Sequence, residues 1–238
     1  MTLISLQLKT ANKFNKNLKR LTKKIKESPE KSIILAPELI LSAYSYDKLD
    51  DAVKFTKKSI KILKLLSKTK TIIITMITKK RDKYYNTLHI FHNNKIVHTQ
   101  SKAILFVLDD ERKYFTAGDI KDIKIIDING IKIAALICFE LRFVELWKQI
   151  QGADVVLVPA MWGKLRKEHY ETLTKALAIT NQCYVIASDS ANENMAKSSA
   201  IISPFGDVVK DDNKKIISSI YNKREIKKMR RYISVGIK

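Results

Sequence analysis

Hydrophobic residues of this chain are arranged in short unbroken runs and in stripes of helical period. The runs, of which Ile131 to Ile137 (IKIAALI) is an example, are typical of strands buried in a sheet. His92-Asn93-Asn94 separates two such stretches, and because asparagine tolerates positive φ, we expect a hairpin turn there. Strands are predicted near residues 2–8, 32–37, 71–78, 84–91, 95–100, 131–137, 154–158, 183–188, 199–203 and 216–220.

The helical stripes are clearest near the start of the chain. Phe14, Leu18, Leu21 and Ile25 recur at spacings of four, three and four residues, and lysines fill the opposite face. We expect helices near residues 11–27, 48–67, 143–151 and 165–181. This many strands with four helices predicts an α/β protein in which two sheets pack face to face and the helices lie outside. No linker or repeat interrupts the pattern, so we expect a single domain over residues 1–238.

Composition is that of an ordinary enzyme-sized domain. A chain of 238 residues can bury roughly 70 to 75% of its unfolded surface without help from disulfides or metals. Of its two cysteines, Cys183 lies inside an apolar strand, where packing explains it. No apolar run is long enough to span a bilayer, and residues 1–6 lack the charged lead and cleavage site of a signal peptide. We therefore expect a cytoplasmic protein that does not bind membranes.

The formal net charge of +21 changes this picture little. Basic residues are spread over residues 9–26, 54–70, 79–83 and 210–238 rather than gathered in one patch. Such a surface attracts nucleic acid nonspecifically at low salt, but we expect no specific nucleic-acid site. The tail at residues 223–231 (KREIKKMRR) is the best exception, and we expect it to dock on the body or on a partner subunit.

Three reactive side chains follow the ends of predicted strands. Cys138 ends the run at residues 131–137, Glu38 follows the strand at residues 32–37, and Lys102 follows the second strand of the hairpin. The C-terminal ends of strands are where open α/β sheets usually gather ligand sites. A carboxylate can take a thiol proton, and an ammonium can stabilise the oxyanion formed when a thiolate attacks a carbonyl. Taken singly, each residue has an ordinary structural explanation, so the prediction depends on all three meeting.

Metal and cofactor chemistry find little support in the sequence. His89 and His92 would point to opposite faces of one strand, and no second pair has the spacing of metal ligands. There is also no glycine-rich phosphate loop. We expect neither a metal nor a cofactor.

Four motifs occur in order along the chain: Ala36-Pro37-Glu38-Leu39, Ser101-Lys102-Ala103-Ile104-Leu105-Phe106, Ile137-Cys138-Phe139-Glu140-Leu141-Arg142-Phe143 and Pro159-Ala160-Met161-Trp162. Through them the chain resembles the nitrilase superfamily of carbon-nitrogen hydrolases. The resemblance extends over nearly the whole chain. It implies a four-layer α-β-β-α sandwich, commonly paired into dimers through helices such as those near residues 143–151 and 165–181.

The resemblance also implies roles for individual residues. Glu38 would be the general base, Lys102 the oxyanion stabiliser and Cys138 the nucleophile, with the backbone N–H of Phe139 completing the oxyanion hole. Glu111 matches the family's second glutamate, which positions the substrate or the lysine. Without the resemblance, Glu111 would be expected to pair with Arg112 or Lys113 on a solvated turn. The other residues expected to contact substrate are Tyr44 and Trp162.

The chain departs from the family pattern at three positions. Ala43 and Lys197 stand where glycine is usual, and Lys175 stands where arginine is common. A side chain in place of glycine is expected to change the backbone conformation or to fill part of the pocket. These departures affect pocket shape and dimer contacts but leave the three catalytic candidates intact.

The sequence therefore predicts a thiol amidohydrolase that cleaves a small linear amide through a cysteine thioester. The motifs around Cys138 and Trp162, with His169-Tyr170, look most like the ω-amidase branch, whose substrates are small dicarboxylate monoamides. An N-carbamoyl-amine hydrolase or another aliphatic amidase remains open, as does a catalytically silent binding or subunit protein on the same scaffold. We expect a homo-oligomer, a dimer or larger.

Overall fold

Two mixed β-sheets form the centre of the computed structural model, which describes residues 1–237. The first sheet has the order β12 (Ile216–Ile220), β1 (Thr2–Leu6), β2 (Ser32–Leu35), β3 (Thr71–Lys80), β4 (Lys83–His92), β5 (Lys95–Ser101). The second has the order β11 (Val208–Lys210), β10 (Ala200–Ile202), β9 (Tyr184–Ser188), β8 (Val155–Pro159), β7 (Ile131–Ala135), β6 (Ile126–Ile128). Strands β1, β2 and β3 run parallel, as do β7, β8 and β9, so each sheet has a parallel centre.

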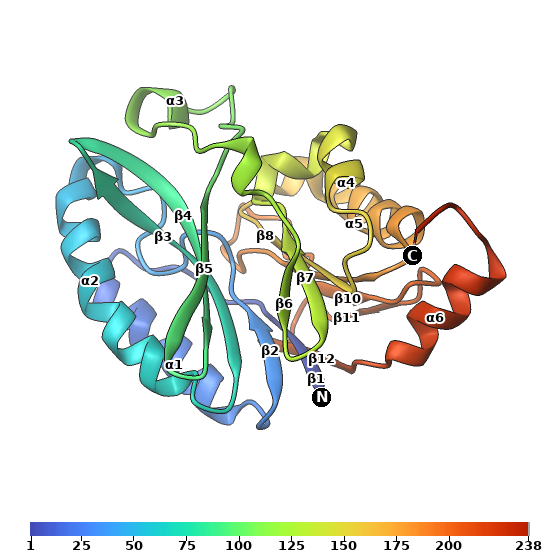
Figure 1. The fold of residues 1–238 in the computed structure, drawn as a ribbon. Coiled ribbons are helices and arrows are strands. Elements are labelled where there is room, and N and C mark those ends of the chain that lie inside the picture. Colours follow the sequence, from blue (N-terminus) through green and yellow to red (C-terminus); the bar gives the residue numbers. More distant parts are fainter. Residues whose placement is uncertain (238) are drawn as a thin grey trace.

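Helices cover the outer faces of both sheets, as Figure 1 shows. Helices α1 (Phe14–Glu27) and α2 (Leu49–Leu66) lie on the first sheet, where Leu21 and Leu63 pack against Ile34 and Ile72. Helices α4 (Val144–Gln149) and α5 (Lys167–Asn181) lie on the second sheet. The predicted four-layer α-β-β-α sandwich is confirmed.

The central core lies between the two sheets. Because side chains alternate along a strand, Leu3 and Ile33 of the first sheet face inward, whereas their neighbours Ile4 and Ile34 face the helices. Two hydroxyl groups also join the sheets, since Ser5 Oγ donates to the carbonyl of Ala187 at 2.5 Å and Ser188 Oγ donates to the carbonyl of Leu6 at 2.6 Å. The sheets are thus fixed in register, and so are the loops that leave their ends.

Every predicted strand and helix is present, with ends shifted by a few residues. The first helix begins at Phe14 rather than near residue 11, because the Asn17 side chain bonds the backbone of Ala11 and holds the preceding segment out of the helix. The hairpin turn is also present, with Asn93 and Asn94 at φ of 48° and 60°. The structure adds short elements that were not predicted, namely β6, β11, α3 (Glu111–Tyr114), η1 (Tyr46–Lys48), η2 (Ile120–Asp122), η3 (Cys138–Arg142) and η4 (Lys164–Arg166).

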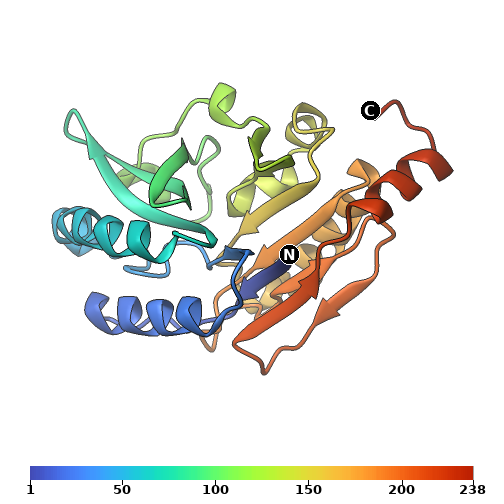
Figure 2. The same ribbon diagram turned by 60° about the horizontal axis from the view of Figure 1, so that its bottom comes forward.

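The basic tail forms a further helix, α6 (Lys223–Tyr232), which lies near the C-terminus (Figure 2). Ile226 is buried in the central core, Met229 is also buried, and Arg230 donates to the carbonyl of Ala153 at 2.7 Å. The tail therefore docks on the body, one of the two expected outcomes. Within residues 1–237, no helix has both the length and the apolar character needed to cross a membrane.

The two positions where glycine is usual in the family keep a left-handed backbone. Ala43 has φ of 53° and Lys197 has φ of 54°. The expected change in conformation is therefore absent at both positions, and each non-glycine residue is held in a conformation that favours glycine.

Candidate active site

Glu38 lies in the loop that leaves the C-terminal end of β2. Its backbone N–H donates to the carbonyl of Ala160 at 3.2 Å, which ties this loop to the segment after β8 in the other sheet. The side chain is fully buried, and its Oε1 accepts from Asn86 Nδ2 at 2.8 Å and from Lys102 Nζ at 3.0 Å. The other oxygen, Oε2, is buried and has no conventional hydrogen-bond partner within residues 1–237. One carboxylate oxygen is thus anchored and the other is available.

Lys102 follows β5 directly and is held from both sides. Its N–H donates to the carbonyl of Asn86 at 2.8 Å, and its own carbonyl accepts from the N–H of Gly118 at 2.8 Å. A Cβ at Gly118 would lie 2.2 Å from the carbonyl oxygen of Ser101, so only glycine allows this close approach. The Lys102 backbone is therefore fixed between β4 and the loop that contains Gly118.

The ammonium of Lys102 lies between two buried carboxylates. Besides Glu38, Nζ contacts Glu111 Oε1 at 2.9 Å and Oε2 at 3.0 Å. Burial by itself would lower the pKa of Lys102, but the negative charges of Glu38 and Glu111 outweigh it and raise that pKa. Lys102 is therefore a permanent cation at this place.

Cys138 opens the η3 turn just beyond β7, with φ of 53°. A left-handed backbone at a non-glycine residue persists only where the surroundings hold it, and it turns the thiol out of the sheet. Burial raises the pKa of Cys138 well above its ordinary value, the charge of Glu38 raises it further, and the charge of Lys102 opposes both. The thiol is therefore protonated at rest and needs a base when it attacks.

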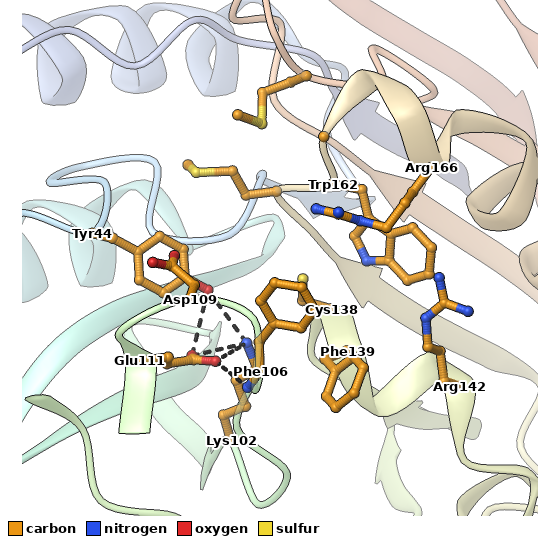
Figure 3. Close-up of a pocket in the computed structure, with 13 residues that line it drawn as sticks. Tyr44, Lys102, Phe106, Asp109, Glu111, Cys138, Phe139, Arg142, Trp162 and Arg166 are labelled. Carbon is orange, nitrogen blue, oxygen red and sulfur yellow. Dashed lines mark hydrogen bonds and ion pairs between the residues drawn. The ribbon is translucent and has the colours of Figure 1, made fainter. Parts of the chain in front are cut away.

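Cys138 and Lys102 line one cavity of about 170 Å³. Figure 3 shows them with the other lining residues, which include Tyr44, Phe106, Asp109, Glu111, Phe139, Arg142, Trp162 and Arg166. Glu38 does not line the cavity but lies behind Lys102. The three residues expected to meet are thus brought together, with two of them at the surface of the cavity.

Glu111 and Tyr44 complete the polar wall. Glu111 is 1% exposed, and its Oε2 accepts from the N–H of Phe106 at 2.5 Å. The alternative of a solvated pair with Arg112 or Lys113 is wrong, because burial turns this carboxylate towards Lys102. Tyr44 Oη lies 3.3 Å from Lys102 Nζ, and burial raises the pKa of this phenol well above its ordinary value, so it stays protonated.

Aromatic side chains and two arginines form the opposite wall. The guanidinium of Arg142 lies over the Trp162 ring, 4.7 Å from its centre, and that of Arg166 lies over the Phe106 ring at 5.3 Å. Phe139 packs edge-on against Phe106, with ring centres 5.1 Å apart. Neither arginine forms an ion pair with a carboxylate within the described residues. Arg142 also contacts His169 Nδ1 at 3.1 Å, so two cations that line the cavity have no carboxylate partner in the described chain and are available to an anionic ligand.

A sequence model of the carbon-nitrogen hydrolase family matches residues 3–232. The chain belongs to the carbon-nitrogen hydrolase family. Relatives of this hydrolase include the 2-oxoglutaramate amidase of Bacillus subtilis, 32% identical over 195 residues that cover 77% of this chain and 74% of the relative. The omega-amidase YafV of Escherichia coli K12 is 31% identical over 118 residues, which cover 48% of this chain and 45% of the relative.

A solved structure of a CN-hydrolase superfamily protein from Xanthomonas campestris has the same fold, with a TM-score of 0.87 at 19% identity over 98% of this chain and 94% of that one. The predicted superfamily, its ω-amidase-like resemblance and its fold are confirmed. Family membership also favours an enzyme over the catalytically silent scaffold that the sequence left open.

Three buried polar residues of this carbon-nitrogen hydrolase were not predicted to belong to the site. Asn86 holds Glu38 from within β4, where an amide inside an apolar strand is a signal that it has a partner. Glu140 accepts from the N–H groups of Ala103 and Ile137, each at 2.6 Å. Asp189 accepts from the N–H of Trp162 at 2.8 Å. Burial raises the pKa of Glu140 and of Asp189 to about 7 in each case.

Metal-ligand geometry does not occur in the part of the hydrolase that the structure describes, where no group of three or more His, Cys, Asp or Glu side chains could hold an ion. His89 is buried within β4, and burial lowers its pKa to about 4, so its ring is neutral. The reactive polar groups that line the cavity are instead the Lys102 ammonium, the Glu111 and Asp109 carboxylates and the Cys138 thiol, together with Tyr44 and the two arginines.

Proposed function

We propose that this carbon-nitrogen hydrolase is a thiol amidohydrolase in which Cys138 is the nucleophile, Glu38 the general base and Lys102 the oxyanion stabiliser. The main support is the position of the Lys102 ammonium, which contacts both Glu38 and Glu111 and shares a small cavity with Cys138. Amidase-named relatives support an amide as the substrate.

The first half-reaction forms a thioester. Glu38 Oε2 accepts no hydrogen bond of ordinary geometry within the described residues, and the Cys138 thiol interacts directly with this carboxylate. Oε2 takes the Cys138 proton as sulfur attacks the amide carbonyl carbon. The carbonyl oxygen becomes an oxyanion held by the Lys102 ammonium and the Phe139 N–H. Glu38 then returns the proton to the amide nitrogen, the C–N bond breaks, and ammonia leaves.

The second half-reaction consumes one water. Glu38 takes a proton from the water as its oxygen attacks the thioester carbonyl, and the same two donors stabilise the second oxyanion. The C–S bond then breaks, the thiol regains its proton, and the carboxylic acid departs. Glu111 keeps the ammonium in place through both halves, because its two oxygens contact Nζ.

We further propose a substrate with a carboxylate at the end opposite the amide, as in a small dicarboxylate monoamide. The guanidinium groups of Arg142 and Arg166 lie over aromatic rings and lack a carboxylate partner within the described residues, which suits them to bind one from a ligand. This supports an ω-amidase, whose substrate carries a carboxylate, over an amidase that acts on neutral aliphatic amides.

The test compares succinamate, 2-oxoglutaramate, N-carbamoyl-β-alanine and butyramide, with release of ammonia and of the amine product measured for each. Butyramide is the matched control, since a methyl group replaces the carboxylate of succinamate. We expect turnover of the monoamides, little turnover of butyramide, and none with Cys138→Ala, which removes the nucleophile and leaves the fold intact. A preference for the carbamoyl compound would replace the ω-amidase assignment, and turnover by Cys138→Ala would refute the nucleophile.

A further inference from the structure

Glu140 is a fully buried carboxylate that has no cation in direct contact within the described residues. It lies in η3, and both of its oxygens accept from backbone N–H groups, Oε1 from Ala103 and Oε2 from Ile137, each at 2.6 Å. These two donors are 34 positions apart in the chain. Ala103 directly follows Lys102, and Ile137 directly precedes Cys138. One side chain therefore connects the two segments that present the ammonium and the thiol.

The connection has a mechanical consequence. Cys138 begins a turn with a left-handed backbone, a conformation that persists only when neighbouring contacts hold it. The Lys102 segment leaves the edge strand β5 for a loop, and its next N–H is the one that Glu140 holds. A carboxylate can satisfy both N–H donors at once, whereas a carboxamide offers one oxygen and turns an N–H₂ donor towards the other.

We propose that Glu140 is a positioning residue that sets the place of the Lys102 ammonium relative to the Cys138 thiol by holding both backbone segments. The inference rests on the proposed function, since it gives Glu140 a part in that same reaction. Glu140 touches neither the cavity nor the reacting atoms, so it acts through the two residues that do.

The test is Glu140→Gln, with Asp189→Asn as the matched control. Asp189 is also fully buried, and its two oxygens likewise accept from backbone N–H groups, those of Trp162 at 2.8 Å and Lys197 at 2.9 Å. Both variants change a carboxylate to a carboxamide, but Asp189 supports the wall that carries Trp162. We expect Glu140→Gln to lower kcat about 10- to 100-fold with little change in KM. Asp189→Asn should mainly raise KM.

A second readout does not require turnover. Iodoacetamide labelling reports Cys138, because Cys183 is fully buried and burial raises its pKa to about 12. The Lys102 charge lowers the pKa of Cys138, so displacing Lys102 slows labelling. If Glu140→Gln only removed a negative charge near the thiol, or only loosened the fold, labelling of Cys138 would instead be faster. We expect labelling of Glu140→Gln at pH 8 to be about threefold slower than wild type, or slower still.

Labelling that is as fast as wild type or faster, or kcat within about threefold of wild type, would overturn the inference. Where Glu140→Gln does not fold, Glu140→Asp replaces it, because its shorter side chain keeps the charge but cannot reach both N–H groups. Slower labelling is expected there too, and unchanged labelling overturns the inference in the same way. A wild type without amidase activity refutes the proposed function, whereas the labelling comparison still decides the role of Glu140.

Discussion

Glu38→Gln separates the proposed base from the structure that surrounds it. In the native protein, Asn86 Nδ2 and Lys102 Nζ lie 2.8 and 3.0 Å from Glu38 Oε1, and the Oε1 of a glutamine could still accept from both. The amide nitrogen takes the place of Oε2, which accepts no hydrogen bond of ordinary geometry within residues 1–237, although the Cys138 thiol and the Tyr44 hydroxyl lie beside this carboxylate. Shape and anchoring are therefore kept, and only the charge and the proton acceptor disappear.

The expected effect on rate is much larger than that on stability. A general base contributes about 10²- to 10⁴-fold, or about 3 to 5 kcal/mol of transition-state stabilisation. Breaking a buried ion pair lowers the free energy of unfolding by a similar amount only when it leaves an unpaired charge. Here Lys102 keeps Glu111 at 2.9 Å, so we expect the melting temperature to change by about 4 °C at most.

The assay combines turnover with thiol labelling. Removal of the Glu38 charge lowers the pKa of Cys138, because that charge raises it in the native site. We expect Glu38→Gln to lose turnover of succinamate by about 10²-fold or more while iodoacetamide labels Cys138 at least as fast as in wild type. Turnover within about tenfold of wild type would refute the reasoning and require another base.

Two other predictions concern specificity and pH. Arg166→Gln should raise KM for succinamate about 10-fold, since a charge-assisted hydrogen bond to the substrate carboxylate is lost, and should leave KM for butyramide unchanged. Steady-state kinetics in which KM rises equally for both substrates would contradict a role of Arg166 in binding the carboxylate. Burial raises the pKa of Glu140 and Asp189 to about 7, and Lys102, which faces Glu140, has a raised pKa and stays charged. Activity should therefore fall as pH drops through about 7. Glu140→Gln should change this acidic side of the pH–rate profile, and a profile identical to that of the wild type would contradict the prediction. Both folded pKa values lie above the ordinary ones, so the contribution of these carboxyls to stability should increase as pH falls from about 7 to 5 in denaturant unfolding.

Much of the fold was predictable because its strands are long apolar runs. β8 and β9 bury every side chain between layers, which leaves the sequence little freedom. The elements that were missed depend on their neighbours. β6 and β11 are three residues long and exist only by pairing with β7 and β10. Helix α6 buries only Ile226 and Met229, too few for a recognisable stripe among its basic residues.

The candidate site likewise contains residues that could be predicted from the sequence and residues that could not. Glu38, Lys102 and Cys138 could be expected to meet because each follows a strand, and topology brings those strand ends to one edge. Asn86 and Glu140 could not be assigned from the sequence, since Asn86 binds a carboxylate 48 residues away and one of the two N–H partners of Glu140, that of Ala103, is 37 residues away. Pairing of this kind is set by how the layers pack.

The enclosure of Lys102 also decides which reactions its nitrogen takes part in. An amine forms a Schiff base with an aldehyde or ketone only after losing a proton, and both flanking carboxylates oppose that loss. A keto acid that occupied the cavity would therefore meet a cation and not an amine nucleophile. The same pairing that equips this nitrogen to stabilise charge keeps it from becoming trapped by carbonyl compounds.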